Sequence, residues 1–187
     1  MGKVYTLSGP RGVGKTATID RLVTDYGIEQ ILTYTDRSPR AEDIQNPKYH
    51  FVKRDEMTDM LGESALTAVL KLPNGERYGT LKQDIEDGLS GDAISIVTSA
   101  TQTARKIKRL YPEVQNLLLL PRMFSDIPLM MMDSGLTAEE IHHRLDNDPN
   151  EFSRLAEFDA LFINPYGEHD RTVSEIAEYI TGLSTEM

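Results

Sequence analysis

Cysteine is absent from the 187-residue chain, and long apolar runs are absent too. Without thiols the chain forms no disulfide, thiolate metal site or cysteine nucleophile, and this composition is typical of a reducing compartment. Even a fully apolar run such as residues 117–120 is far shorter than the roughly 20 residues that span a bilayer. We therefore expect a cytoplasmic protein with no membrane partner.

Basic residues are in the minority. The chain has 20 Lys and Arg against 30 Asp and Glu, which gives a formal net charge of −10. Such a chain repels phosphate backbones and acidic membrane surfaces, so general nucleic-acid binding is disfavoured. Any anionic ligand must then be held by a local cluster of Lys, Arg or glycine-rich backbone.

The order of the apolar patterns predicts an α/β fold. Residues 3–8 are rich in β-forming side chains, and after a glycine loop the spacing changes to that of a helix that Gly27 ends. Three later apolar runs are continuous, as in strands buried on both faces of a parallel sheet: 93–97, 116–120 and 160–163. Helical patterns separate them. We predict a parallel sheet with helices on both faces.

Two segments interrupt this rhythm within what we predict to be one domain, residues 1–187. The first, about 33–92, contains the turn signal PNG between two apolar runs, which predicts a hairpin. The second is about 125–151. The expected core comprises about 1–32, 93–124 and 152–187.

Three threonines are followed three residues later by Gln or Glu, a pattern typical of helix starts. The pairs are Thr80 with Gln83, Thr137 with Glu140, and Thr172 with Glu175. The second pair is flanked by Leu136 and Ile141, at the two positions of a hydrophobic staple. We therefore expect helices to begin at these three places.

Residues 9–16, GPRGVGKT, fit the pattern GxxxxGK(S/T) between a predicted strand and a predicted helix. Such glycines let backbone N–H groups turn toward a β-phosphate, and the helix N-terminus adds its positive dipole end. Lys15 would bridge the β- and γ-phosphates, and the Thr16 hydroxyl would bind Mg²⁺. An ordinary glycine turn is disfavoured because all the fixed positions agree. The predicted ATP-binding residues are Gly9, Pro10, Arg11, Gly12, Val13, Gly14, Lys15 and Thr16.

Arg37 and Arg40 lie three residues apart just after a predicted strand. A kinase needs a second cationic pocket for its acceptor phosphate, and an arginine pair suits that task. Nearby hydroxyl donors are Thr33, Thr35 and Tyr49. The spacing alone nevertheless favours a surface pair balanced by Asp36 and Glu42.

Four stretches together resemble the guanylate kinase family. GPRGVGKT, TDRSPRAED, KYHFV and YGT occur in that order and at near-family spacing, and EVQNLLLLP, TAEEIHHRL and FDALFIN resemble later parts of the family. The resemblance implies a P-loop core with a mobile nucleoside-monophosphate-binding region and a lid. The two interrupting segments match those regions.

The resemblance also implies roles for residues by their position. ATP would be held by the loop with Lys15 and Thr16. The acceptor phosphate would be surrounded by Arg37, Arg40, Tyr49 and Tyr78, and the acceptor nucleoside by Thr33, Asp43 and Thr80. Arg144 would reach the transferring phosphoryl group. The implied catalytic residues are Lys15, Arg37, Arg40 and Arg144.

The chain departs from the family pattern at three kinds of charged position. A carboxylate that pairs with guanine, carboxylates at the end of a core strand and an arginine in the lid are replaced. These positions fall at Ala68 or Val69, at Thr98 and Ala100, and at Ser134. Two counts disagree by one residue at the first position, which indicates a hairpin one residue longer than usual.

The sequence thus predicts ATP-dependent phosphoryl transfer with Mg²⁺ to a nucleoside monophosphate, with the base left open. The alternative is a catalytically weakened relative that binds nucleotide or a phosphorylated partner. A P-loop NTPase switch is less favoured, because no predicted core strand ends in the acid that supports metal and water. Residues 129–132, LMMM, fit either an adaptable surface or core packing.

Overall fold

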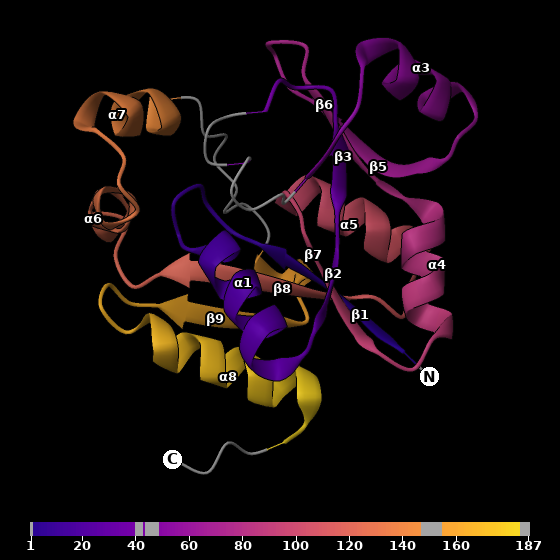
Figure 1. Ribbon diagram of the computed structural model, residues 1–187. Coiled ribbons are helices and arrows are strands. Elements are labelled where there is room, and N and C mark those ends of the chain that lie inside the picture. The colour runs from indigo at the N-terminus through magenta and orange to yellow at the C-terminus, as the bar shows by residue number, and fades with distance from the viewer. Residues whose placement is uncertain (1, 40–42, 44–48, 147–154, 184–187) are drawn as a thin grey trace.

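The computed structural model describes residues 2–39, 43, 49–146 and 155–183. Two sheets organise this part of the chain, and Figure 1 shows the second sheet above the core sheet. Among the described helices, none is long and apolar enough to cross a membrane.

The core sheet has five strands within the described residues, all parallel, in the order β2-β7-β1-β8-β9. Their bounds are β1 Lys3–Ser8, β2 Glu29–Ile31, β7 Ile94–Thr98, β8 Gln115–Pro121 and β9 Ala160–Asn164. The strands β1, β7 and β8 are almost wholly buried, which is why their sequences are apolar without alternation. The predicted α/β class with a helix-flanked parallel sheet is confirmed.

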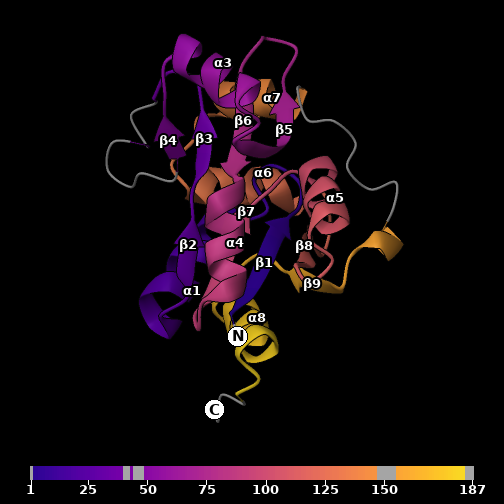
Figure 2. The same cartoon turned by 90° about the vertical axis from the view of Figure 1, so that its right-hand side faces the viewer.

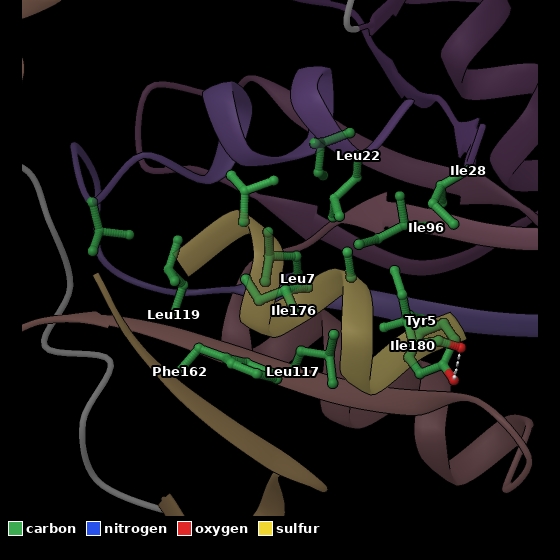
Figure 3. Packing of buried hydrophobic residues seen from close by; sticks show 14 residues of the cluster. Tyr5, Leu7, Leu22, Ile28, Ile96, Leu117, Leu119, Phe162, Ile176 and Ile180 are labelled. Carbon is green, nitrogen blue, oxygen red and sulfur yellow. Dashed lines mark hydrogen bonds between the residues drawn. The ribbon is translucent and has the colours of Figure 1, made fainter. Parts of the chain in front are cut away.

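Helices α1 (Lys15–Tyr26) and α8 (His169–Thr181) cover one face of this sheet. Leu22 and Ile176 pack there against Leu7, and the hydroxyl of Tyr5 donates to the carbonyl of Ile180 over 3.3 Å (Figure 3). Burial of this apolar surface is the main force that holds the helices on the sheet.

Helices α4 (Lys82–Ser90) and α5 (Thr101–Leu110) cover the opposite face (Figure 2). Ile85 of α4 and Ile107 of α5 share a buried cluster with the strand residues Val4 and Val97. Helix α4 therefore packs on the core sheet although its sequence follows the hairpin directly.

The second sheet has the strand order β4-β3-β6-β5 in the described part of the chain. Its strands are β3 Thr33–Thr35, β4 Tyr49–Phe51, β5 Leu66–Lys71 and β6 Arg77–Leu81, and helix α3 (Arg54–Gly62) lies between β4 and β5 in sequence. The predicted hairpin is confirmed, since β5 and β6 pair in antiparallel fashion. Only Leu32 separates β2 from β3, so one stretch of chain joins the two sheets.

A bulge interrupts the β5–β6 ladder. Thr67 pairs with Thr80 and Leu70 with Tyr78, so β5 has one residue more than β6 across this interval. Ala68, inside the bulge, adopts the left-handed conformation with φ 52°. This extra residue accounts for the one-residue disagreement between the two counts through the hairpin.

One of the three predicted helix starts is confirmed. Glu140 accepts from the backbone N–H of Thr137 at 2.8 Å, one residue before α7 (Ala138–Asp146). The start at Thr80 was wrong, because Thr80 stays in β6 and α4 begins two residues later. The start at Thr172 was also wrong: α8 begins at His169, and the Thr172 hydroxyl donates to a strand carbonyl.

Two shorter elements complete the chain. Helix α6 (Asp126–Asp133) follows β8, and the 3₁₀ helix η1 (Leu155–Glu157) precedes β9. Figure 1 shows α6 and α7 on the same side of the molecule as the loop that joins β1 to α1. That side carries the candidate site.

Candidate nucleotide site

The loop 9–14 joins β1 to α1 as the sequence predicted. Gly14 caps α1 with φ 96° and supplies no side-chain hydrogen bond to the first turn of the helix. No acidic residue lies in that first turn, so the positive end of the helix dipole is not neutralised there. This geometry suits a phosphate group.

Lys15 lies folded over the loop. Its ammonium group donates to the carbonyl of Gly9 at 2.5 Å and to that of Pro10 at 2.8 Å. These contacts keep the charge beside the uncapped helix start. A triphosphate in the loop would find this ammonium group close by, held by two loop carbonyls.

Close neighbours and positive φ values favour glycine in the loop, most of all at Gly9, where a Cβ would lie 2.2 Å from the backbone oxygen of Leu119. Gly12 has φ 85°, and a Cβ there would lie 2.4 Å from the Met131 side chain of α6. A Cβ on Gly14 would lie 2.9 Å from Nδ2 of Asn164. The loop is thus packed between α6 and the end of β9.

Two supporting residues escaped the sequence analysis. Asn164 donates from Nδ2 to the Val13 carbonyl at 2.9 Å, and His169 Nε2 lies 3.1 Å from the Thr18 hydroxyl. Burial lowers the pKa of His169, Arg21 lowers it further and Asp170 opposes the shift. A polar residue ending an apolar strand is the signal that could have revealed Asn164.

The donor set around the loop fits a magnesium ion only together with a nucleotide. The side chain of Thr16 is exposed at the start of α1. The neighbouring core strands end in Ser8, Thr98 and Asn164, none of them acidic, and the described residues contain no group of three His, Asp or Glu side chains that could hold a metal. Because Mg²⁺ takes oxygens from phosphates and water, one protein hydroxyl suffices.

Arg37 is buried and not a surface residue. Its guanidinium donates to both carboxylate oxygens of Asp43, over 2.7 and 2.9 Å, and both side chains are 5% exposed. Asp36 is instead engaged by Arg77 of β6 at 2.7 Å. The expected surface pairing of Arg37 with Asp36 was therefore wrong.

Aromatic rings surround the Arg37 guanidinium. Its central carbon lies 4.9 Å from the ring centre of Tyr49 and 5.0 Å from that of Phe51. Tyr78 packs edge-on against Tyr49 and donates to Glu76 at 3.0 Å. Burial, with the bond to Glu76, raises the pKa of Tyr78 to about 12, so its hydroxyl stays a donor at neutral pH.

The remaining predicted site residues fall in three places. Thr33 donates to the Thr98 carbonyl at 3.4 Å, and Thr80 is buried in β6. Arg40 lies outside the described residues, and of Arg144 only the backbone, within α7, is described. Ser134, at the lid position, follows α6 and donates to the Met130 carbonyl at 3.0 Å.

The methionine-rich helix α6 has one buried and one exposed face. Met131 and Ile127 are buried against the loop at Gly12, while Leu129 and Met132 are exposed. The helix therefore touches the loop 9–14 directly. Its outer surface stays free of core contacts.

A cavity of about 460 Å³ lies elsewhere, between β2 and α4. Its lining includes the carboxylates Glu29, Asp84, Asp87 and Asp92. Such a lining repels phosphate. This cavity is not the nucleotide site.

Comparison with known proteins agrees with this geometry. The family described as "Guanylate kinase" matches residues 1–182. The guanylate kinase of Histophilus somni is 28% identical over 167 residues, which cover 87% of this chain and 80% of that protein. That of Haemophilus influenzae is 25% identical over 179 residues, 94% of this chain and 85% of that protein.

A solved structure shares the fold. The crystal structure of guanylate kinase from Anaplasma phagocytophilum superposes with a TM-score of 0.73 at 16% identity, over 100% of this chain and 88% of that one. At this identity the likeness concerns the fold.

Proposed function

The chain belongs to the guanylate kinase family, and from that premise we propose that it transfers the γ-phosphoryl group of ATP to a nucleoside monophosphate. GMP is the first acceptor to try, because it is the substrate that the name of the relatives implies. A cytoplasmic location is part of the proposal, because the phosphoryl donor is ATP and a chain without cysteine is typical of a reducing compartment.

One observation carries the proposal: two candidate anion sites share one edge of the core sheet. The phosphate loop follows β1, and Thr33 of the second sheet contacts Thr98 at the end of β7, the strand beside β1. Arg37 follows β3 in that second sheet. An ATP on the loop and a phosphate near Arg37 would therefore meet at the carboxyl ends of the strands, where α/β folds bind ligands.

We assign the donor side as follows. Lys15 leaves the Gly9 and Pro10 carbonyls to bind the β- and γ-phosphates, and the backbone N–H groups at the start of α1 bind the β-phosphate. Thr16 holds Mg²⁺, which neutralises charge on the phosphates when bound. Arg144 of the lid helix is proposed to approach the transferring group.

The acceptor side supplies positioning and positive charge. Arg37 binds the acceptor phosphate with Tyr49 and Tyr78, and Asp43 keeps the guanidinium oriented. Arg40 would add the second cation. Positioning and charge are the main contributions that a protein makes to phosphoryl transfer.

A panel assay tests this function. ATP·Mg²⁺ is incubated with each ribo- and deoxyribonucleoside monophosphate, and products are separated by ion-exchange chromatography. We expect a nucleoside diphosphate together with ADP for at least one acceptor. Transfer to none, by protein that calorimetry shows to bind ATP, would refute the kinase.

A second candidate function is a binding module that has lost turnover. The observation that favours it is the absence of acid at the described ends of the core strands, together with Ser134 at the lid position. This function predicts that ATP and a monophosphate raise Tm without producing ADP. Phosphoryl transfer at a rate above that of the Lys15→Ala variant would exclude it.

A further inference from the structure

The acid-lined cavity between β2 and α4 also reaches the second sheet. Its lining includes β2, then Leu32, the single residue that separates β2 from β3, and His50 of β4. Helix α4 and the residues that lead into β7 line the rest. A molecule in this cavity would therefore contact both sheets at the point where the chain passes from one to the other.

The cavity lies on the face of the second sheet that is turned away from Arg37. The rings of Tyr49 and Phe51 lie against the Arg37 guanidinium. His50 stands between them in β4, so its ring points to the other face, where it stacks on Tyr34 with the ring centres 4.6 Å apart. The cavity is thus separate from the proposed acceptor site.

Carboxylates dominate the polar lining of the cavity. It contains no Lys or Arg, and Glu29, Asp84 and Asp87 form no ion pair within the described residues. Asp87 accepts a hydrogen bond from the neutral Gln83 at 2.7 Å. Burial, with the charge of Asp87, raises the pKa of Asp84, and His50 opposes the shift. The negative charge of these three carboxylates is therefore left for a ligand to neutralise.

A buried hydroxyl also faces the cavity. Ser95 is 2% exposed and is part of the lining. It stands two residues before Val97 in β7, so both side chains point to the sheet face that α4 covers, and a Cβ on Gly88 of α4 would lie 3.3 Å from its Oγ. The hydroxyl makes no hydrogen bond within the described part of the chain. A buried polar group without a partner destabilises a fold, and a ligand with a donor would supply that partner.

The arrangement suits an extended cation better than a metal ion. Among the described residues, no three His, Asp or Glu side chains gather closely enough to hold a metal. The carboxylates are instead distributed around a cavity of about 460 Å³, a volume typical of small-molecule sites. Apolar side chains share the lining, namely Ile31, Leu32 and Ala93. Separate ammonium groups joined by methylene groups match both parts of this lining.

We propose that this cavity binds a small aliphatic polyamine. Its ammonium groups pair with Asp84 and Asp87 of α4, and one of them donates to Oγ of Ser95. Its methylene groups pack on the apolar lining at Leu32. The inference goes beyond phosphoryl transfer and does not depend on it, because the lining contains none of the residues assigned to the nucleotides.

Calorimetry with putrescine and butylamine tests this class of ligand. The two amines have the same carbon chain, and only putrescine carries a second ammonium group. We expect putrescine to bind at least about tenfold more tightly, because it makes a second charge-assisted hydrogen bond. Equal Kd values for the two amines, or no binding of putrescine, would overturn the inference.

Two substitutions separate binding from folding. Burial and Asp87 disfavour the ionised form of Asp84, so Asp84→Asn should keep or raise Tm, while the Kd for putrescine rises about tenfold. Ser95→Ala should raise that Kd about 3- to 5-fold with little change in Tm, because its hydroxyl has no described partner in the free protein. If Asp84→Asn lowers Tm, the exposed Asp87→Asn gives the same measurement without disturbing the fold.

The matched control is Glu139→Gln in α7, which removes one negative charge from an exposed position. Figure 1 shows α7 and α4 on opposite sides of the molecule. We expect this variant to keep the wild-type Kd for putrescine. Equal weakening in Glu139→Gln and Asp84→Asn would show that the acidic chain attracts the amine only as a whole. That result, or an unchanged Kd in Asp84→Asn, would contradict a site in the cavity.

Discussion

The phosphate loop and the second sheet hold their candidate ligands by different means. The loop is shaped by backbone: Gly12 and Gly14 fit against α6 and β9, and an amide side chain holds the Val13 carbonyl. The second sheet is shaped by buried charge, in the pairs Arg37–Asp43 and Asp36–Arg77. A short sequence motif determines the backbone geometry of the loop, whereas a charge pair such as Asp36–Arg77 depends on residues far apart in the sequence.

The largest expected effect is on the buried charge. Arg37→Ala leaves Asp43 buried without its guanidinium, which should lower the free energy of unfolding by about 3–5 kcal/mol. Urea unfolding measures this. The double variant Arg37→Met/Asp43→Asn, which removes both charges, should recover most of the loss.

The exposed Arg21, which joins α1 to α8 through Asp170, is the comparison on the loop side. Arg21→Ala should have the same urea midpoint as the wild type within experimental error, because exposed ion pairs contribute little to the free energy of unfolding. Equal losses from Arg21→Ala and Arg37→Ala would contradict the contrast between the two regions.

The next largest effect is on catalysis at the loop. Lys15→Ala removes the cation that lies over Gly9 and Pro10, and we expect the rate of phosphoryl transfer to fall by about 10²–10³, as for other preorganised donors to a developing charge. Tm should change little. Lys3→Ala, an exposed residue at the start of β1, is the control and should keep the wild-type rate.

A smaller effect is expected from the support of the loop. Asn164→Ala removes the hydrogen bond to the Val13 carbonyl, which should weaken ATP binding about 3- to 10-fold while the Kd for the monophosphate stays constant. Asn116→Ala, in the same sheet but away from the loop, should lower Tm only. Calorimetry with each nucleotide alone distinguishes these outcomes.

The smallest effect is a difference in pH response. Burial lowers the folded-state pKa of His169, so its contribution to stability is present above the ordinary value of 6.5 and is lost as pH falls from there through the lowered pKa. Burial pushes the pKa of Asp36 up, but the hydrogen bonds and charge of Arg77 hold it below 3.8. The contribution of Asp36 to stability is therefore present above pH 3.8 and is lost as pH falls from there through the lowered pKa.

The Tm, measured by thermal unfolding between pH 8 and pH 5, should decline as pH falls in the wild type and should not decline in His169→Gln. The exposed His50→Gln variant is its control and should keep the decline. If the Tm of His169→Gln still declines over this pH range, another titrating group causes the decline.

The core was predictable from sequence because its signals are local. Continuous apolar runs gave β7, β8 and β9, and the loop motif was flanked by the expected strand and helix. The helix starts at Thr80 and Thr172 were wrong for one reason. In both cases tertiary burial of the threonine, in a strand for Thr80 and inside a helix for Thr172, outweighed its local capping pattern.

The acceptor side was less predictable because its contacts are not local. Spacing suggested Asp36 as a partner of Arg37, but successive residues leaving a strand point to opposite faces, and Asp36 instead meets Arg77 across the β3–β6 ladder. Asn164 acts on a carbonyl 151 positions away. No pattern within a window of ordinary length contains such a pair.

Transfer of a labelled phosphate tests the central claim most directly. The protein is incubated with ATP labelled in its γ-phosphate and with GMP, and the labelled products are separated. The account predicts label in the β-phosphate of GDP, in amounts equal to the ADP formed. The wild type should release no more labelled inorganic phosphate than Lys15→Ala does. Label released only as inorganic phosphate, or retained entirely in ATP, would contradict it.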